Sequence, residues 1–227
     1  MSNQVKELMW SDLPIPWKIC LEESWLAYQN GSVPIGAVIT NSNGDIIAQA
    51  RNRIHETTYY DKQVNLNQLA HAELNVLLKI DQNTKDVHSL SIYTSLEPCP
   101  LCMGAIYMSG IRNVFFAAWD PYAGSVNMIG KTPYLSVKPM KIHSPHSPLL
   151  ESIIIALQTE YLLQHIHHKV NDSVNPVIQK WQEVYPKPVK IGHQLYQNNW
   201  VQTASREIMN PSEFFDKMAN FVSQENI

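Results

Sequence analysis

Two short motifs contain side chains that could bind a metal ion and move protons. The first is His71–Glu73, with the sequence His-Ala-Glu, and the second is Pro98–Cys102, with the sequence Pro-Cys-Pro-Leu-Cys. Imidazole nitrogen and thiolate sulfur are ligands that zinc prefers in a tetrahedral site. His71, Cys99 and Cys102 are therefore expected to hold Zn²⁺. Three protein ligands leave the fourth position to water, which is the arrangement of a catalytic site.

Glu73 has the position and the chemistry of a proton carrier beside this metal. It is two residues from His71, so on a helix it points away from the ligand face while still reaching the open coordination position. Zinc lowers the pKa of bound water to about 7, which makes hydroxide available at neutral pH. A carboxylate there can take the proton of the water and pass it to a ring nitrogen and then to departing ammonia. Such help typically contributes about 10²–10⁴ in rate.

A Cys-x-x-Cys by itself is more often structural or redox-active than catalytic. Structural zinc sites close with a fourth Cys or His, but the sequence has no second Cys-x-x-Cys and no His-x₃-His. The His-x-Glu motif that precedes the pair therefore favours a catalytic site. The remaining cysteine, Cys20, is expected to be a small buried hydrophobe. A second cluster, the histidine tract at 165–168, could bind metal, but its place at a helix end favours an electrostatic role.

The elements that must position these motifs alternate between helices and strands. Asn-Gly at 43–44 between two apolar, β-branched runs predicts a hairpin, and a proline opens the helix that carries Cys102. This order predicts an α/β fold, a three-layer α/β/α sandwich around a central mixed sheet. The expected helices are 16–29, 69–80 and 100–108; the expected strands are 33–40, 45–48, 90–94, 114–118 and 137–142; a polar loop covers 54–67.

The pattern changes to helices alone from Pro148 onward. Helices are expected at 149–165, 176–184 and 211–224, with the Pro-rich stretch 185–188 separating two of them. The chain is thus divided into a core, 1–150, and a C-terminal helical extension, 151–227, whose first helix packs on the core. Aromatic residues of the extension either pack it onto the core or close over a substrate. These aromatic residues are Trp181, Tyr185, Tyr196 and Trp200.

His-x-Glu followed by Pro-Cys-x-x-Cys resembles the cytidine and deoxycytidylate deaminase superfamily, whose members use zinc to deaminate nucleobases. Four more segments resemble the branch that contains tRNA-adenosine deaminases and guanine deaminases. They are 33–38, 52–53, 96–99 and 102–106. The resemblance covers about 16–163 and implies that the core is a zinc-dependent deaminase domain. Members of the superfamily form dimers or larger oligomers, so the resemblance also implies a homodimer.

The same resemblance suggests which residues bind the substrate. Asn52 resembles an asparagine that contacts the base or ribose, although an Asn after a strand is commonly a turn residue. The backbone of Ala72 and the strand at Gly36 and Ala37 resemble the walls of the base pocket. Asp120 lies where the tRNA enzymes have an Asp after an Arg. Trp119 replaces that Arg here, and it could stack on a base or pack in the core. The tyrosines at 59–60 could line the pocket mouth or pack within their loop.

Charge favours a small substrate. The chain has 17 basic and 20 acidic residues and a net charge of −3, without the basic excess of proteins that neutralise many phosphates. With the loss of the Arg before Asp120, this favours a free base, nucleoside or nucleotide over a polynucleotide, and the branch resemblance implies a purine-type amino group. The alternative is a tRNA wobble-adenosine deaminase with a basic surface formed by Arg51, Arg53, Arg112, Lys131, Lys138 and Lys141. A catalytically silent zinc module is disfavoured, because it would not need Glu73.

The remaining features concern location. No apolar run approaches the about 18 residues of a membrane span, and the first ten residues lack the apolar segment of a secretory signal. Three cysteines, two of them in one pair, argue against a disulfide framework. We expect a cytoplasmic protein with no membrane partner.

Overall fold

The computed structural model describes residues 9–81, 83–84, 86–143, 145, 147–166 and 175–224. A five-stranded sheet has the strand order β2-β1-β3-β4-β5. Strand β1 pairs antiparallel with β2 and β3, whereas β3, β4 and β5 pair in parallel, so the predicted mixed sheet is confirmed. The strands are β1 (Gly36–Thr40), β2 (Ile46–Arg51), β3 (Ser91–Thr94), β4 (Asn113–Phe116) and β5 (Lys141–His143).

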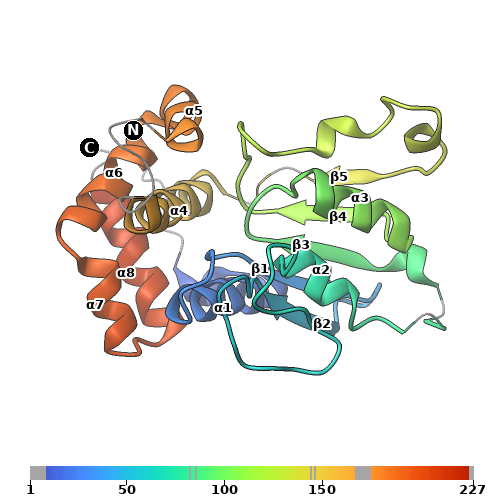
Figure 1. Ribbon diagram of the computed structural model, residues 1–227, viewed down its shortest axis with the longest axis horizontal. Helices are drawn as coiled ribbons and strands as arrows, with labels where there is room; N and C mark the ends of the chain where they lie inside the picture. The colour runs from blue at the N-terminus through green and yellow to red at the C-terminus, as the bar shows by residue number, and fades with distance from the viewer. Residues whose placement is uncertain are drawn as a thin grey trace, which may run out of the picture.

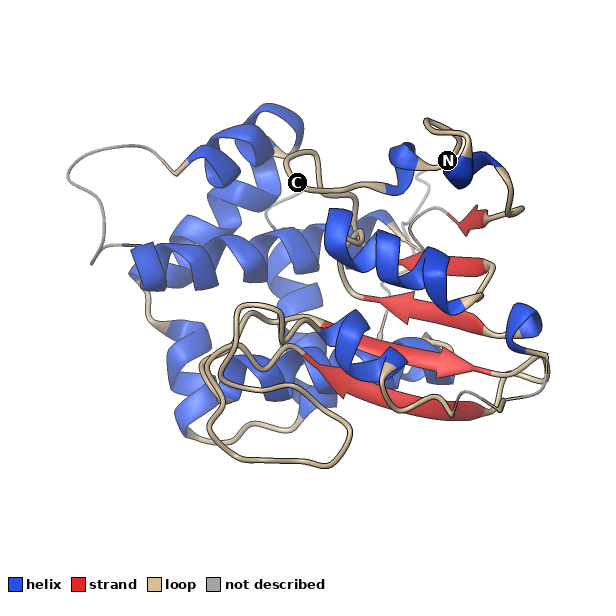
Figure 2. Cartoon of the chain, turned by 45° about the vertical axis from the view of Figure 1, so that its right-hand side comes forward, coloured by secondary structure: helices blue, strands red, loops and turns tan. Residues whose placement is uncertain are grey.

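Helices cover both faces of the sheet, which confirms the three layers (Figures 1 and 2). Helix α1 (Ile15–Gln29) packs on one face, and α2 (Ala72–Leu77) with α3 (Pro100–Ser109) packs on the other. Side chains alternate between the faces along each strand. Ala37 and Ile39 of β1 join the buried cluster beneath α2 and α3, whereas Val38 joins the cluster of α1.

The start of β1 packs very closely on α1. A Cβ atom at Gly36 would lie 2.0 Å from the carbonyl oxygen of Cys20 and 2.7 Å from the backbone nitrogen of Ser24. The Cys20 thiol donates a hydrogen bond of 3.2 Å to the Gly36 carbonyl, and Cys20 has no exposed surface, as predicted. A glycine is therefore required at this position because the strand touches the helix backbone.

The C-terminal part of the chain is helical, as expected, but it has more helices than the sequence pattern predicted. It contains α4 (Pro148–Ile166), α5 (Pro176–Val184), α6 (Pro186–Gln197), α7 (Trp200–Arg206) and α8 (Pro211–Gln224). The prediction that the Pro-rich stretch only separates two helices was wrong, since Pro186 begins α6. Proline fits the first turn of a helix, where the missing N–H has no helical partner.

Several other element bounds differ from the prediction. Helix α2 covers Ala72–Leu77 and not 69–80, β2 ends at Arg51 and not at 48, and the last strand is β5, Lys141–His143, and not 137–142. The proposed boundary at 150 lies within α4, which begins at Pro148. Among the described helices, none has both the length and the apolar character to cross a membrane.

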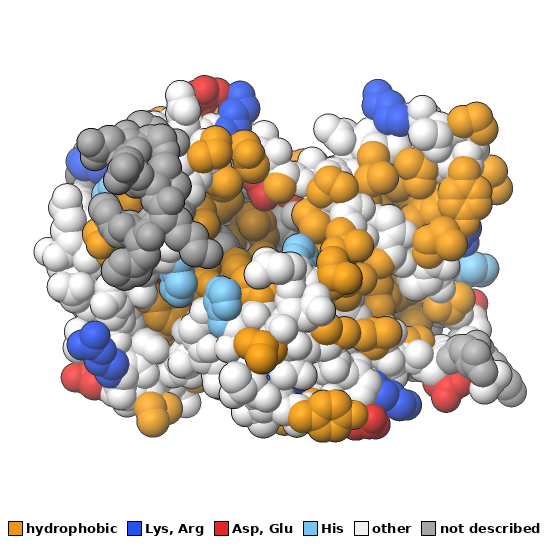
Figure 3. Space-filling view, viewed as in Figure 1, with side chains coloured by type: hydrophobic (Ala, Val, Ile, Leu, Met, Phe, Trp, Pro, Cys, Tyr) orange, Lys and Arg blue, Asp and Glu red, His pale blue; other side chains and the backbone are white. Residues whose placement is uncertain are grey.

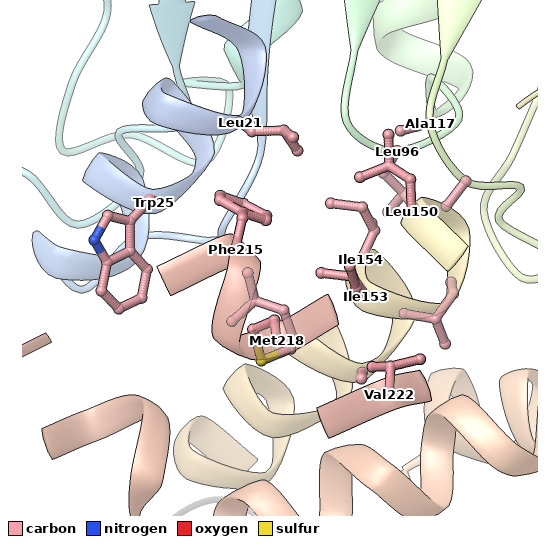
Figure 4. Packing of buried hydrophobic residues seen from close by; sticks show 14 of the residues in the cluster. Leu21, Trp25, Leu96, Ala117, Leu150, Ile153, Ile154, Phe215, Met218 and Val222 are labelled. Carbon is pink, nitrogen blue, oxygen red and sulfur yellow. The ribbon is translucent and has the colours of Figure 1, made fainter. Parts of the chain in front are cut away.

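A large apolar cluster joins α1 to the C-terminal helices. Helix α4 packs against α6 and α8, and Figure 4 shows Phe215 and Met218 of α8 pointing into the space between α1 and α4. The rings of Trp25 and Phe214 stack with their centroids 3.7 Å apart. The Trp25 indole N–H also donates a 2.8 Å hydrogen bond to the Met209 carbonyl. The extension is thus held by burial and by specific polar contacts.

Candidate metal centre and active site

The three predicted metal ligands lie at the N-termini of two neighbouring helices. His71 is the residue before α2, with extended backbone, rather than a member of its first turn as expected. Cys99 holds the same place before α3, and Cys102 lies in the first turn of that helix. Because α2 and α3 pack side by side on one face of the sheet, their starts bring these side chains together. The free N–H groups of α3 favour thiolate over thiol.

The distances between the ligand atoms fit one zinc ion. Nδ1 of His71 lies 3.6 Å from Sγ of Cys99 and 3.3 Å from Sγ of Cys102, and all three atoms lie within 4.8 Å of one another. Tetrahedral zinc, with bonds of about 2.3 Å to sulfur and about 2.0 Å to nitrogen, separates these atom types by about 3.6 Å. Across the described ranges, no fourth His, Cys, Asp or Glu belongs to this group.

The two cysteines have pKa values shifted in opposite directions. The Cys102 thiol donates a hydrogen bond to the Cys99 sulfur and lowers the pKa of Cys99 to about 4, with His71 adding to the effect. The same hydrogen bond, together with burial, raises the pKa of Cys102. One thiolate is therefore available at neutral pH, and a divalent cation would favour loss of the second proton.

Glu73 lies beside the ligands without belonging to the ligand group. Only 4% of its surface is exposed, and burial raises the pKa of its carboxyl. Oε1 of Glu73 lies 3.4 Å from the hydroxyl of Thr94, at the end of β3. A buried carboxylate with a raised pKa can both accept and return a proton near neutral pH.

The residues expected to bind the substrate lie near these helix starts. Asn52 follows β2 and is 2% exposed, and its Oδ1 accepts a 3.2 Å hydrogen bond from the backbone N–H of Ile54, as in a turn. Ala37 and Ala72 are buried in the same apolar cluster under α2. The position that a Gly36 side chain would take faces α1, on the other side of the sheet. Substrate contacts of these four residues stay a prediction.

Asp120 is the centre of a turn that follows β4. Its Oδ1 accepts hydrogen bonds from the backbone N–H groups of Tyr122 and Ala123, at 2.9 and 3.1 Å. The indole N–H of Trp181, on α5, donates to the same oxygen at 2.9 Å. Trp119 remains 39% exposed, and its ring contacts Phe116 edge-on with centroids 4.6 Å apart.

Two residues that the sequence reasoning did not assign connect this turn to the metal ligands. Glu97 is 8% exposed, and its carboxylate accepts the N–H groups of Asp120 and Val126 at 3.1 and 3.2 Å. A Cβ atom at Gly124 would lie 2.0 Å from Oε2 of Glu97. Ser125 then donates its N–H to the Pro98 carbonyl at 3.0 Å. The sequence signal for Glu97 was its place directly before Pro98, within the segment 96–99 that resembles the deaminase branch.

Of the cations expected to form a basic surface, the two arginines on either side of Asn52 pair with carboxylates. Arg51 pairs with Glu56 at 2.7 Å and Glu23 at 3.5 Å. Arg53 has no exposed surface, pairs with Glu56 at 2.9 Å, and lies under the ring of Tyr60, 4.1 Å from its centroid. Guanidinium groups that are buried against carboxylates cannot also bind phosphates.

The remaining four cations differ from one another. Lys138 donates a 2.8 Å hydrogen bond to the carbonyl of Tyr107, and one guanidinium nitrogen of Arg112 is buried without a hydrogen-bond partner. Lys131 and Lys141 are exposed. The six residues therefore do not form one continuous basic surface.

Two other predicted features have local roles. Nδ1–H of His165 donates a 2.8 Å hydrogen bond to the Tyr161 carbonyl, and the imidazole stacks on the Tyr161 ring. His167 and His168 lie outside the described residues. Tyr59 is 74% exposed, whereas Tyr60 covers the arginines, so the loop packs one of its two tyrosines.

The comparison with known proteins agrees with the geometry of the metal centre. The model of the cytidine and deoxycytidylate deaminase zinc-binding region matches residues 16–118. The tRNA-specific adenosine deaminase of Aquifex aeolicus is 34% identical over 111 residues, which are 48% of this chain and 68% of that protein. This chain belongs to the cytidine and deoxycytidylate deaminase superfamily. Members are zinc-dependent deaminases, and the three-ligand group of this member binds Zn²⁺.

Two further relatives describe the extent of the likeness. The tRNA-specific adenosine deaminase of Bacillus subtilis is 38% identical over 112 residues, and the match spans 47% of this deaminase-family chain but only 62% of the relative. A solved structure of a mutant protein in complex with 8-azaguanine shares the fold, with a TM-score of 0.52 and 22% identity over 66% of this chain and 83% of that one. The family model ends at 118, before the turn at Asp120 and the extension.

Proposed function

We propose that this protein is a hydrolytic deaminase that releases ammonia from a purine-type ring of a free base, nucleoside or nucleotide. The observation that carries the proposal is a three-ligand zinc group with the buried carboxyl of Glu73 beside it and no fourth protein ligand among the described side chains. A structural site would be closed by a fourth ligand, whereas a hydrolytic site needs a position for water.

The reaction replaces an exocyclic amino group by an oxygen atom from water. When bound, zinc lowers the pKa of a water molecule to about 7 and so supplies a nucleophile at neutral pH. Glu73 takes the proton that the water loses and delivers it to the ring nitrogen. It then takes the remaining hydroxyl proton and gives it to the amino group, which leaves as ammonia. The buried methyl groups of Ala37 and Ala72 exclude bulk water from this proton path.

The ion pairs of Arg51 and Arg53 support a small substrate. Arg51 pairs with Glu56 and Glu23, and Arg53 pairs with Glu56. Two carboxylates therefore balance the two guanidinium groups beside Asn52. A polynucleotide substrate needs several phosphate contacts, and the two exposed lysines, Lys131 and Lys141, are the remaining candidates of the expected basic surface.

A second candidate function is the deamination of the wobble adenosine of a tRNA. Relatives named tRNA-specific adenosine deaminase, at 38% and 34% identity, support it. This function would require phosphate contacts from residues other than Arg51 and Arg53. The lysines at 131 and 141 are the residues to test, because loss of a phosphate contact weakens binding and reduces its salt dependence.

We also propose a homodimer, with its interface on the outer surfaces of α2 and α3. Leu78, Leu101 and Met108 expose 50%, 41% and 64% of their surfaces there, and exposed apolar patches commonly mark protein interfaces. Light scattering after size-exclusion chromatography should give twice the chain mass. A Met108→Asp variant that elutes as a monomer would support this surface, whereas a wild-type monomer would contradict it.

The experiment that tests the function is an ammonia-release screen over bases, nucleosides, nucleotides and an anticodon stem-loop. Activity on a purine base, nucleoside or nucleotide is the expected result. Glu73→Ala serves as the control, because it should keep zinc and lose turnover. Activity on the stem-loop alone, reduced in Lys131→Ala or Lys141→Ala, would favour the tRNA function. Full activity of Glu73→Ala would contradict both.

A further inference from the structure

We propose that Trp181, in the C-terminal extension, is a positioning residue for the metal centre. Its indole N–H holds the carboxylate of Asp120, and the turn built on Asp120 in turn holds the segment that carries Cys99. The extension would then be a working part of the active site and not only a covering layer. This inference rests on the proposed deaminase function, since positioning is expected to serve that reaction.

The first step is the contact between Trp181 and Asp120. The indole is 2% exposed and its nitrogen lies 2.9 Å from Oδ1 of Asp120, which is itself 8% exposed. Hydrogen bonds to an ionised acceptor are about twice as strong as those between neutral groups. The same oxygen also accepts the N–H groups of Tyr122 and Ala123. The indole is therefore the one contact of this oxygen, among those identified, that comes from another part of the chain.

The second step connects the turn to the metal ligands. The backbone N–H of Asp120 donates to Glu97, two residues before Cys99 in the chain. Glu97 also accepts the N–H of Val126, so its carboxylate spans the two ends of the turn. Ser125 closes the connection through its 3.0 Å hydrogen bond to the Pro98 carbonyl. A displacement of the turn would therefore also move Pro98, the residue next to Cys99, because Ser125 hydrogen-bonds to its carbonyl.

A second set of hydrogen bonds from the extension lies next to the contact between Trp181 and Asp120. The hydroxyl of Tyr185 donates a 2.7 Å hydrogen bond to Oε1 of Glu151, on α4. That oxygen also accepts the backbone N–H of Trp119 at 3.2 Å. Trp181 thus contacts Asp120 directly, and Tyr185 is connected to the preceding residue, Trp119, through Glu151. Figure 3 shows that the surface is hollowed between the extension and the sheet domain, with hydrophobic side chains around the hollow.

The protein offers a matched control for this role. Trp25 is also fully buried, and its indole N–H also donates one hydrogen bond, of 2.8 Å, between the core and the C-terminal part of the chain. Its acceptor is the carbonyl of Met209, just before α8, and not the turn at Asp120. Replacing either tryptophan by phenylalanine removes one buried N–H and part of a ring. Only Trp181→Phe should affect the metal centre.

The test compares Trp181→Phe and Trp25→Phe in the full-length zinc-loaded protein. Hydrogen exchange at the amides of Tyr122 and Ala123 should become at least about tenfold faster in Trp181→Phe and stay within about twofold in Trp25→Phe. Release of zinc to a chelator should be faster only in Trp181→Phe. Activity is measured with the substrate identified by the screen, at a temperature well below the Tm of each variant. Under these conditions kcat/KM should fall about tenfold in Trp181→Phe.

Unchanged exchange at both amides in Trp181→Phe, or equal changes in the two variants, would overturn the proposal. If Trp181→Phe does not fold, Asp120→Asn tests the same contact, because it keeps an acceptor oxygen but removes its charge. The same amides should then exchange faster, by a smaller factor, and unchanged exchange would again overturn it. Exchange and zinc release need no substrate. Absence of deaminase activity in the wild-type protein would therefore refute the proposed function, while exchange and zinc release would still test the positioning role.

Discussion

The metal centre and the junction with the C-terminal extension are both buried and polar, but they are assembled in different ways. The zinc ligands come from two short motifs at the starts of adjacent helices. The junction joins Glu97, Asp120, Glu151 and Trp181, which lie in four separate parts of the chain. The difference indicates that local structure places the ligands within each motif and one helix–helix contact joins the two motifs, whereas the turn beside them depends on several long-range contacts.

The largest expected effect belongs to the metal centre. Glu73→Gln should lower kcat by about 10²–10⁴, because the amide cannot carry the proton. Zinc content, measured by metal analysis of the purified protein, should stay at the wild-type value, since Glu73 is outside the ligand group. Loss of zinc in this variant would contradict the assignment of metal binding and proton transfer to different residues.

A substitution in the turn should show how tightly the junction is packed. Gly124→Ala should lower the free energy of unfolding by about 2–3 kcal/mol, because the new Cβ would meet Glu97 and the Asp120 carbonyl at 2.0 and 2.5 Å. Urea denaturation measures the change. The matched control is Gly104→Ala in α3, where a Cβ meets nothing within 4 Å, and which should be more stable by about 0.5–1 kcal/mol. Equal loss in both variants would contradict the packing.

A buried carboxyl elsewhere in the extension should give stability a pH dependence. Burial raises the pKa of Glu160 to about 7, and Tyr28 donates a 2.8 Å hydrogen bond to it. The folded protein therefore holds this proton more tightly than the unfolded chain, whose glutamate pKa is about 4.3. This contribution is present below about pH 4 and is lost as the pH rises through about 7.

The measurement is urea denaturation from pH 5 to pH 8. The free energy of unfolding should fall by up to about 2 kcal/mol from this group, and Glu160→Gln should reduce that slope. An unchanged slope in the variant would show that other groups cause the dependence. Because Glu160 touches neither the metal centre nor the turn, kcat at fixed pH should not change.

The smallest effect is expected on the outer surface of the extension. Lys180 and Glu183 form an exposed ion pair of 2.6 Å on α5, close in sequence to Trp181. Lys180→Ala should change the free energy of unfolding by less than about 0.5 kcal/mol, because water screens exposed charges. Hydrogen exchange at Tyr122 should also stay the same. A large change in either quantity would mean that the whole helix, and not one indole, holds the turn.

The part that could be predicted from sequence depends on short spacings. Cys99 and Cys102 are one helical turn apart, and a helix start is signalled by Pro100, so their convergence follows from helix geometry. The hairpin of β1 and β2 follows from its Asn-Gly turn and β-branched runs. The bounds of α2 and β5 were less accurate, because the ends of short elements depend on packing and not on periodicity.

The sequence by itself predicted the zinc ligands, the proton carrier and the order of helices and strands, since His-x-Glu and Cys-x-x-Cys each lie within one helical turn. Only the tertiary structure decided that Arg51 and Arg53 pair with Glu56 and Glu23 and that Trp181 reaches Asp120. Such pairs have no fixed spacing along the chain. They form because folding excludes water from both partners, and a buried polar group must then find its hydrogen bond within the protein.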